Sequence, residues 1–329
     1  MTWGTVTLAD EPTELLLAFA AWHAHLGASE IHIFLDRPNK PTAQALRDIP
    51  GVIVSECDDM FWHANGGRGL IQTRRQDAVA NLAYAETDTD WLIHMDADEF
   101  LIDSRDILAE LLALPETILG LRVPVRERVW TMAPETVFEG SFKVPLPGKL
   151  GLDHHLYGEL SRYMQRGLIG HTRGKTICRT GQDLVMSIHG PRDQDTMNLM
   201  EAQSLHLLHF DGLTPFHWLL KRLKYASLPH AEAKKNTDHY RWNQIGALQT
   251  MDTLDEARRF QEELTFLKPE FATKLRALGL LEDAPTFEIG AALRKYSLDD
   301  LDLSAARFDR RLRRRDREFV EEIGWGAED

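Results

Sequence analysis

The most constraining feature of this chain is an apolar run that ends abruptly in carboxylates. Residues 91–95 (Trp-Leu-Ile-His-Met) are typical of a buried strand, and Asp96, Asp98 and Glu99 follow before apolar residues return. Ligands of open α/β sheets bind at the carboxyl ends of the strands, so this pattern predicts acids at a binding edge. Two carboxylates separated by the small Ala97 can hold a hard divalent cation that is shared with substrate phosphates. The other interpretation is a strand end with solvated acids, because an isolated Asp-X-Asp is common.

Strands and helices alternate through the first two thirds of the sequence. We expect strands at residues 3–8, 31–35, 52–56, 91–95, 118–125, 175–179 and 184–189, and helices at 13–26, 42–48, 72–84 and 104–114. Strand, helix and strand in succession with short links predict parallel βαβ units with right-handed crossovers. The predicted fold class is therefore α/β, with a Rossmann-like, mixed but mainly parallel sheet flanked by helices and a helical appendage at the carboxyl end. Residues 126–163, rich in proline and glycine, are predicted to be irregular.

The strand at 91–95 and its acids resemble the metal-dependent glycosyltransferases of the GT-A fold, in particular the family 2-like group. In that group a strand of the first domain ends in a hydrophobic-Asp-X-Asp-Glu-Phe signature, which Asp96, Asp98, Glu99 and Phe100 match. The resemblance implies a GT-A-like domain in which Asp96 and Asp98 bind Mn²⁺ or Mg²⁺ between the protein and a nucleotide diphosphate sugar, most simply a UDP-sugar. The acceptor would be a hydroxyl group of a glycan or another molecule.

The same resemblance assigns the nucleotide-binding residues. The family's opening is matched by Asp10, Glu11 and a helix containing His23, and its next strand runs into a nucleotide-contacting acid, here Asp36. The relatives also direct an Arg or Lys from the helix before the metal motif toward the nucleotide, which corresponds to Arg75. The ordinary alternatives are a turn residue for Asp36 and a solvated helix face for Arg75.

A second stretch, Leu205 to His217, resembles the His-Phe-X-Gly segment of family 8 glycosyltransferases of the same fold. There the His joins the two acids on the metal, so the resemblance implies that His209 is a third ligand and that the backbone at Gly212 approaches the diphosphate. Thr214 stands where the family has a Lys. A histidine in the protein core is the alternative for His209.

The general base is left open between two acids. Transfer to a hydroxyl needs a carboxylate or a histidine within hydrogen-bonding reach of the acceptor. Asp153 and Asp183 both lie in regions that suit this role, and the sequence does not choose between them. Inversion and retention of the sugar configuration also both remain open.

Composition limits the partners. The formal net charge of −13 argues against general nucleic-acid binding, which requires a basic surface. Two cysteines, Cys57 and Cys178, form no disulfide framework, and the amino terminus has neither a secretory signal nor an apolar run long enough to span a membrane. We therefore expect a soluble, cytoplasmic protein. The Arg-rich helix near residues 307–317 could contact a membrane surface peripherally, although its interleaved acids favour a solvated helix.

Two domains are predicted: residues 1–215 as the nucleotide-sugar-binding and catalytic domain, and residues 216–329 as a helical region. Two other functions remain open on the sequence. One is another metal-dependent nucleotidyl or phosphoryl transferase, although the glycine- and Arg/Lys-rich loop typical of nucleotidyltransferases is missing near the amino terminus. The other is a non-catalytic binding protein on a degenerate transferase scaffold.

Overall fold

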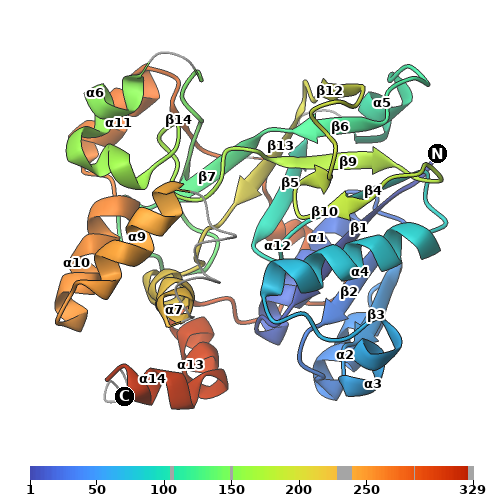
Figure 1. Cartoon of the computed structure of the whole chain (residues 1–329), viewed down its shortest axis with the longest axis horizontal. Helices are drawn as coiled ribbons and strands as arrows, with labels where there is room; N and C mark the ends of the chain where they lie inside the picture. The colour runs from blue at the N-terminus through green and yellow to red at the C-terminus, as the bar shows by residue number, and fades with distance from the viewer. Residues whose placement is uncertain (104–106, 149–150, 228–238, 285, 325–329) are drawn as a thin grey trace. The chain divides into compact units, whose positions relative to one another are not determined.

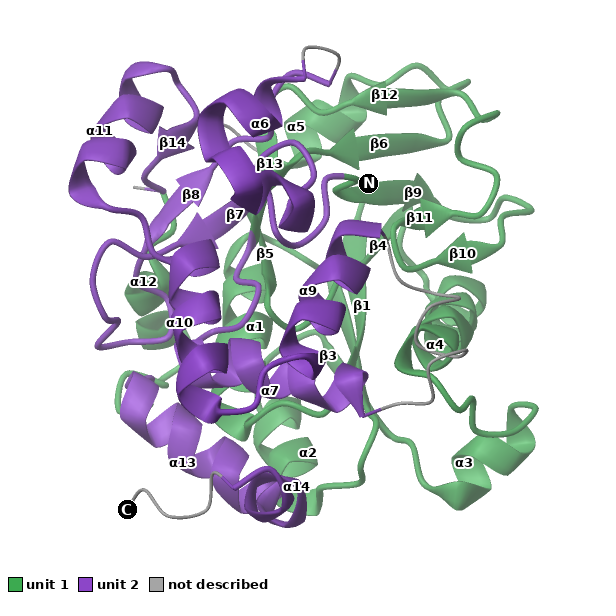
Figure 2. Cartoon of the chain, turned by 60° about the vertical axis from the view of Figure 1, so that its left-hand side comes forward, with its two compact units in different colours: residues 1–125, 173–208, 285–301 green, residues 126–172, 209–284, 302–329 purple. Residues whose placement is uncertain are grey.

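A computed structural model describes residues 1–103, 107–148, 151–227, 239–284 and 286–324. The chain divides into two compact units, shown in green and purple in Figure 2. Unit 1 comprises residues 1–125, 173–208 and 285–301, and unit 2 comprises residues 126–172, 209–284 and 302–329. The predicted division into a catalytic domain, residues 1–215, and a helical region, residues 216–329, stays a prediction.

Unit 1 alternates strands and helices (Figure 1). Its strands are β1 (Trp3–Ala9), β2 (Glu30–Leu35), β3 (Val52–Glu56), β4 (Trp91–His94), β5 (Glu99–Asp103), β6 (Gly120–Val123), β9 (Lys175–Arg179), β10 (Met186–Ser187), β11 (Gly190–Pro191), β12 (Leu199–Glu201) and β13 (Leu205–His209), whose last residue belongs to unit 2. Its helices are α1 (Thr13–His25), α2 (Lys40–Arg47), α3 (Asp59–Ala64), α4 (Gln72–Glu86), α5 (Ile107–Leu112) and α12 (Ile289–Lys295).

A seven-stranded sheet forms the centre of unit 1, in the order β12-β6-β9-β4-β1-β2-β3. β1 pairs in parallel with β2 and β4, β2 pairs in parallel with β3, and β12 pairs in parallel with β6. β9 alone among these strands runs antiparallel to its neighbours, β4 and β6. The predicted mixed, mainly parallel sheet flanked by helices is confirmed.

Helices pack on this sheet because apolar residues alternate along its strands. Val6, Leu8 and Leu92 form one buried cluster with the α4 residues Val79 and Ala83. Helix α1 is apolar all round rather than on one stripe, and its residues from Glu14 to Ala24 are all buried. It contacts β2, β5, α2 and α12, which is how a helix without a polar face becomes covered.

Unit 2 contains β7 (Val125–Val129, whose first residue belongs to unit 1), β8 (Ser141–Lys143), α6 (Leu152–Tyr157), a 3₁₀ helix η1 (Gly158–Tyr163), α7 (Pro215–Ala226), α9 (His239–Gln249), α10 (Leu254–Thr265), α11 (Pro269–Ala277), β14 (Leu281–Glu282), α13 (Ala305–Arg315) and α14 (Arg317–Glu322). β8 pairs antiparallel with β14 on one side and with β7 on the other. The carboxyl-terminal helices of the prediction are therefore present.

Three sequence expectations differ from the structure. The strand expected at 118–125 is interrupted at Pro124, which has no backbone N–H, and continues as the separate strands β6 and β7. The strand expected at 184–189 is reduced to β10, which forms a short antiparallel pair with β11. Residues 126–163 are not all irregular, because they contain most of β7, together with β8, α6 and η1. The start of the helix expected at 104–114 lies outside the described residues.

The Arg-rich helix α13 buries its apolar residues inside unit 2. Phe308 and Leu312 are buried, and α13 contacts α7. The Arg313 guanidinium lies 4.3 Å from the centre of the Phe216 ring, and Thr214 donates a hydrogen bond to Asp309. Among the described residues, no helix has both the length and the apolar character needed to cross a bilayer. Peripheral membrane contact stays a prediction, and it would have to use the charged face of α13.

Candidate functional site

Three neighbouring parallel strands of unit 1 are each followed by an acid. Asp96 comes shortly after β4, Asp10 directly after β1 and Asp36 directly after β2, and the sheet places these strands side by side in the order β4-β1-β2. Because carboxyl ends of parallel strands lie at one edge of a sheet, the structure brings together three residues that the sequence predicted separately. Each of these acids has a basic partner, and the three pairings differ.

Asp96 lies in a network with a buried lysine. Lys175, the first residue of β9, places its Nζ 3.0 Å from Asp96 Oδ2 and 3.1 Å from Glu99 Oε2, and it also donates to the Ile188 carbonyl at 2.7 Å. The amide side chain of Gln76 on α4 donates to the other Asp96 oxygen, while the Asp96 backbone N–H donates to Glu99 Oε2 at 2.8 Å. Both carboxylate oxygens of Asp96 therefore accept hydrogen bonds, one from Gln76 and one from Lys175.

Two charged groups of this network, Lys175 and Glu99, are buried, and each affects the pKa of the other. Lys175 and Glu99 have side chains that are 1% and 0% exposed. Burial raises the pKa of Glu99 to about 7, although Lys175 opposes that shift. Burial disfavours the ammonium of Lys175, but Asp96 and Glu99 outweigh that effect and raise its pKa. The lysine is therefore a fixed cation beside Asp96.

Sequence reasoning missed Lys175, Gln76 and the role of Glu99. β9 runs antiparallel to β4, with Ile177 opposite Ile93, so β9 begins where β4 ends. The available signal was a lysine at the start of a strand whose central residues, Ile177 and Cys178, are apolar. It could not be used without knowing that β9 pairs with β4, which lies about eighty residues earlier in the chain.

Asp36 and Arg75 are in direct contact. Arg75 donates from Nε at 3.0 Å and from Nη2 at 2.8 Å to the two carboxylate oxygens of Asp36. Arg68 adds a third contact at 2.8 Å and also donates to the Asp36 carbonyl at 3.1 Å. Arg75, whose position in the first turn of α4 is unfavourable to the helix dipole, is thus held there by a carboxylate. Arg68 comes from the glycine-rich segment 65–70, and its side chain is 40% exposed.

The remaining predicted residues of unit 1 have the following positions. Asp10 forms an ion pair with Arg37, with 2.7 Å between Oδ2 and Nη2, and Glu11 is half-buried beside it. Asp98 is 4% exposed in the turn between β4 and β5. Asp183 is exposed in the loop between β9 and β10. The assigned roles of these residues stay predictions.

A divalent cation is compatible with the donors present in unit 1. Asp96 and Asp98 offer hard carboxylate oxygens, which are the ligands that Mg²⁺ and Mn²⁺ take in proteins. With Glu99 ionised, the three carboxylates and one ammonium leave a formal charge that a divalent ion would neutralise.

In unit 2, Gly212 has a structural requirement. Its φ is +77°, and a Cβ at this position would lie 2.5 Å from the Trp218 Cβ and 2.6 Å from its Cα. The Gly212 carbonyl accepts a hydrogen bond from Arg128. The glycine is therefore required by close packing at the start of α7, and its predicted approach to a phosphate stays untested.

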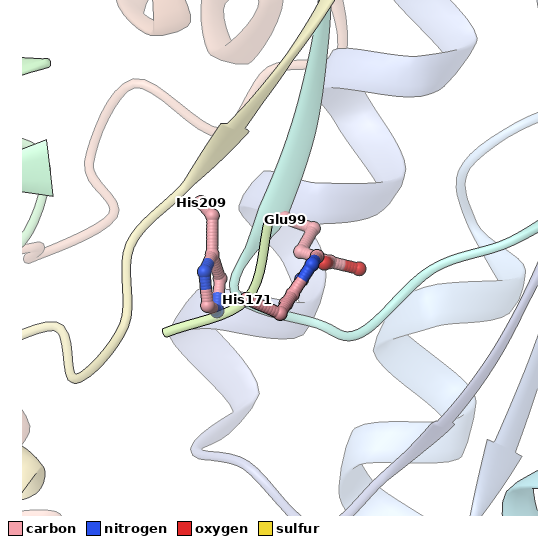
Figure 3. Close-up of side chains that lie close together, drawn as sticks. All are labelled: Glu99, His171 and His209. Atoms are coloured by element: carbon pink, nitrogen blue, oxygen red, sulfur yellow. The ribbon is translucent and has the colours of Figure 1, made fainter. Parts of the chain in front are cut away.

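His209 is the last residue of β13 and is 5% exposed. Burial, together with the nearby His171, holds the pKa of its imidazole well below the usual range, so the ring is neutral. Its Nδ1 makes no hydrogen bond within the described part of the chain. Figure 3 shows His209 beside His171, with ring centres 4.8 Å apart, and it also draws Glu99 of unit 1. The predicted ligation of one ion by His209, Asp96 and Asp98 involves both units and stays a prediction.

Asp153 is half-buried in the first turn of α6, and its Oδ1 has no hydrogen-bond partner among the described residues. An acceptor oxygen without a donor is a feature expected of a general base before substrate arrives. Asp153 and the exposed Asp183 therefore differ in environment, which the sequence did not reveal.

No protein family model and no curated protein matches this sequence. Among solved structures, the chain is similar to TarS of S. aureus. The structure of TarS 1-349 in complex with UDP-GlcNAc shares 13% sequence identity, covers 92% of this chain and 89% of that chain, and has a TM-score of 0.36. The match to a mycobacterial protein covers 68% of this chain and 74% of that protein, with 10% identity and a TM-score of 0.33. HddC from Yersinia pseudotuberculosis covers 65% and 79%, with 10% identity and a TM-score of 0.28.

Proposed function

We propose that this chain is a metal-dependent glycosyltransferase that moves a sugar from a nucleotide diphosphate sugar, most simply a UDP-sugar, to a hydroxyl acceptor such as a glycan. The observation that carries the proposal is the row of acids Asp96, Asp10 and Asp36 after the neighbouring parallel strands β4, β1 and β2. Such an edge is where open α/β sheets bind nucleotides. The likeness of residues 91–100 to the GT-A signature supplies the reaction class.

The proposed donor site uses the contacts described for unit 1. Asp36, with Arg75 and Arg68, would hold the nucleoside end of the donor, with the exposed Arg68 guanidinium available to an anionic group. Asp96 and Asp98 would hold Mn²⁺ or Mg²⁺, which would neutralise charge on the departing diphosphate. Lys175 and Gln76 keep the Asp96 carboxylate in a single orientation, which reduces the cost of assembling such a site.

The acceptor hydroxyl must lose a proton as it attacks the sugar. Asp153 is the preferred base, because its buried Oδ1 has no donor among the described residues, whereas Asp183 is exposed to solvent. The Asp153→Asn and Asp183→Asn variants separate the two assignments. The variant at the base should retain donor binding while losing transfer.

A thermal-shift panel of UDP-, GDP-, CMP- and dTDP-sugars, with and without Mn²⁺, tests the function. A ligand that binds only the folded protein at a hundredfold excess over its Kd adds about 2.7 kcal/mol, which corresponds to a shift on the order of 5 °C. We expect one donor to stabilise the protein only when metal is present. The released product identifies the reaction, because a nucleoside diphosphate indicates sugar transfer and pyrophosphate indicates nucleotidyl transfer.

The Asp98→Asn variant should lose the metal-dependent shift while keeping the wild-type melting temperature without ligand. Asp88→Asn is the matched control, since Asp88 is an exposed acid just before β4, away from the proposed edge. Unchanged turnover in Asp98→Asn would refute the role of Asp98. A donor-induced shift without any turnover would instead favour a binding protein.

A further inference from the structure

The described residues of unit 2 contain a pair of histidines that the proposed function does not fully use. His171 lies at the end of segment 164–172, and His209 is the last residue of β13. Their ring centres are 4.8 Å apart, with an interplanar angle of 39°. One ring nitrogen of His171 and one of His209 lie within 4.8 Å of each other. Figure 3 shows the two rings side by side. That separation suits two nitrogens that face the same ion rather than each other.

The His209 ring is buried without a partner for one of its nitrogens. It is 5% exposed, and its Nδ1 has no hydrogen bond among the described residues. A buried polar atom left in this state costs about 1–3 kcal/mol, so native proteins normally supply a partner. A metal ion is one such partner, and it binds the neutral imidazole that burial favours.

The backbone before His171 is held in place by a buried carboxylate. Glu127 on β7 is 0% exposed and accepts the N–H of Ile169 at 2.8 Å and the N–H of Gly170. A Cβ on Gly170 would lie 2.5 Å from Glu127 Oε2 and 2.8 Å from His209 Cε1. Gly170 thus packs against both the carboxylate and the His209 ring, and this contact fixes where the next residue, His171, must lie.

We propose that His171 and His209 bind the same transition-metal ion, with Glu127 as a positioning residue for His171. This inference goes beyond the proposed function, because both imidazoles belong to unit 2 and the site has a metal preference of its own. Two nitrogen ligands select Mn²⁺, Co²⁺ or Zn²⁺ over Mg²⁺ and Ca²⁺, because Mg²⁺ and Ca²⁺ prefer oxygen.

Electron spin-echo spectroscopy of the full-length protein with one equivalent of Mn²⁺ tests the proposal directly. Nitrogen couplings from two imidazoles are expected in the wild type and from one imidazole in His171→Asn. Calorimetric titration should show Mn²⁺ affinity at least tenfold weaker in His171→Asn, with Mg²⁺ binding changed much less. His155→Asn, an exposed histidine of the same unit, is the control and should match the wild type in both measurements.

The Gly170→Ala variant provides a second test that keeps both imidazoles. It should weaken Mn²⁺ binding because its methyl group displaces either Glu127 or the His209 ring. Circular dichroism establishes that each variant is folded. Two-imidazole couplings and wild-type Mn²⁺ affinity in a folded His171→Asn protein would overturn the inference.

The two proposals fail in different ways. If a nucleotide sugar stabilises the protein in the presence of metal, and folded His171→Asn keeps the wild-type Mn²⁺ affinity, the histidine site is wrong and the transferase proposal stands. If Mn²⁺ shows two imidazole ligands but no nucleotide sugar binds, the histidine site stands and the transferase proposal fails.

Discussion

At the scale of single residues, one buried cation of unit 1 is paired with carboxylates from a distant segment of the chain. Lys175 is the clearest case, because its ammonium lies against Asp96 and Glu99 and is 1% exposed. A buried ion pair adds little net stability compared with apolar residues, but removing one partner leaves the other charge uncompensated. Its value here is that it holds Asp96 in a defined orientation.

Replacing Lys175 by Met should therefore destabilise unit 1 strongly. We expect a loss of about 3–5 kcal/mol in the free energy of unfolding at pH 7, measured by urea denaturation without metal. The double variant Lys175→Met, Glu99→Gln should recover part of this loss, because it removes one of the two stranded carboxylates. A single variant as stable as the wild type would show that the lysine is not a required counter-charge.

Gly212 and Gly246 provide a matched pair of glycine substitutions. Gly212→Ala should cost about 2–4 kcal/mol, because φ is positive and the new Cβ meets the backbone of Trp218. Gly246→Ala, in the interior of α9 with no atom within 4 Å of the new Cβ, should stabilise by about 0.5–1 kcal/mol. Thermal denaturation checks both, and equal effects would contradict the packing argument.

At the scale of elements, helix α1 organises one side of unit 1 through apolar contacts and a single histidine. His23 has Nδ1 2.9 Å from the Phe19 carbonyl, and its Nε2 accepts the N–H of Leu101 on β5 at 3.3 Å. These contacts assign the proton to Nδ1. Burial lowers the pKa of His23 to about 3, so the helix is joined to β5 by a neutral imidazole.

This histidine should make the protein sensitive to acid. The folded-state pKa of about 3 lies below the ordinary value of 6.5. Between these two pH values, His23 is therefore protonated in the unfolded chain and neutral in the folded chain. The contribution of His23 is present above pH 6.5 and is lost as the pH falls, by about 1.4 kcal/mol per pH unit. Urea denaturation between pH 7 and 5 should show a smaller decline for His23→Gln.

The exposed His155 is the control for this pH experiment, and His155→Gln should keep the wild-type slope. A His23→Gln protein whose stability declines with acid as steeply as the wild type would mean that His23 is protonated in the folded protein.

At the scale of the whole molecule, both units are assembled from segments that are far apart in the sequence. Residues 285–301 belong to unit 1, although unit 2 residues precede and follow them. Phe287 contacts Trp22 and Phe100 with ring centres 4.7 and 5.3 Å apart, and α12 contacts α1. The helix that covers α1 therefore comes from the last fifty residues of the chain.

Leu293→Ala in α12 should loosen α1 while sparing unit 2. Leu293 is 6% exposed, and truncating a buried leucine costs about 2–5 kcal/mol. Hydrogen exchange followed by mass spectrometry should show faster exchange in α1, with little change in α10 of unit 2. Equal acceleration in α1 and α10 would instead mean that the two units unfold as one.

The sequence by itself determined the features that depend on local order. The alternation of strands and helices predicted the mixed, mainly parallel sheet of unit 1. The apolar run from Trp91 predicted a strand that ends just before the acids. Periodicity and turn residues act over a few positions, so these could be inferred without tertiary contacts.

Only the tertiary structure decided which distant residues meet. The pairing of Lys175 with Asp96, of Arg75 with Asp36 and of His171 with His209 depends on strand order and on the course of long connections. The sequence named four of these six residues, Asp96, Arg75, Asp36 and His209, but missed Lys175 and His171 and left every pairing open. The physical reason is that burial and charge compensation are properties of neighbours in space, which the pattern along a single strand does not contain.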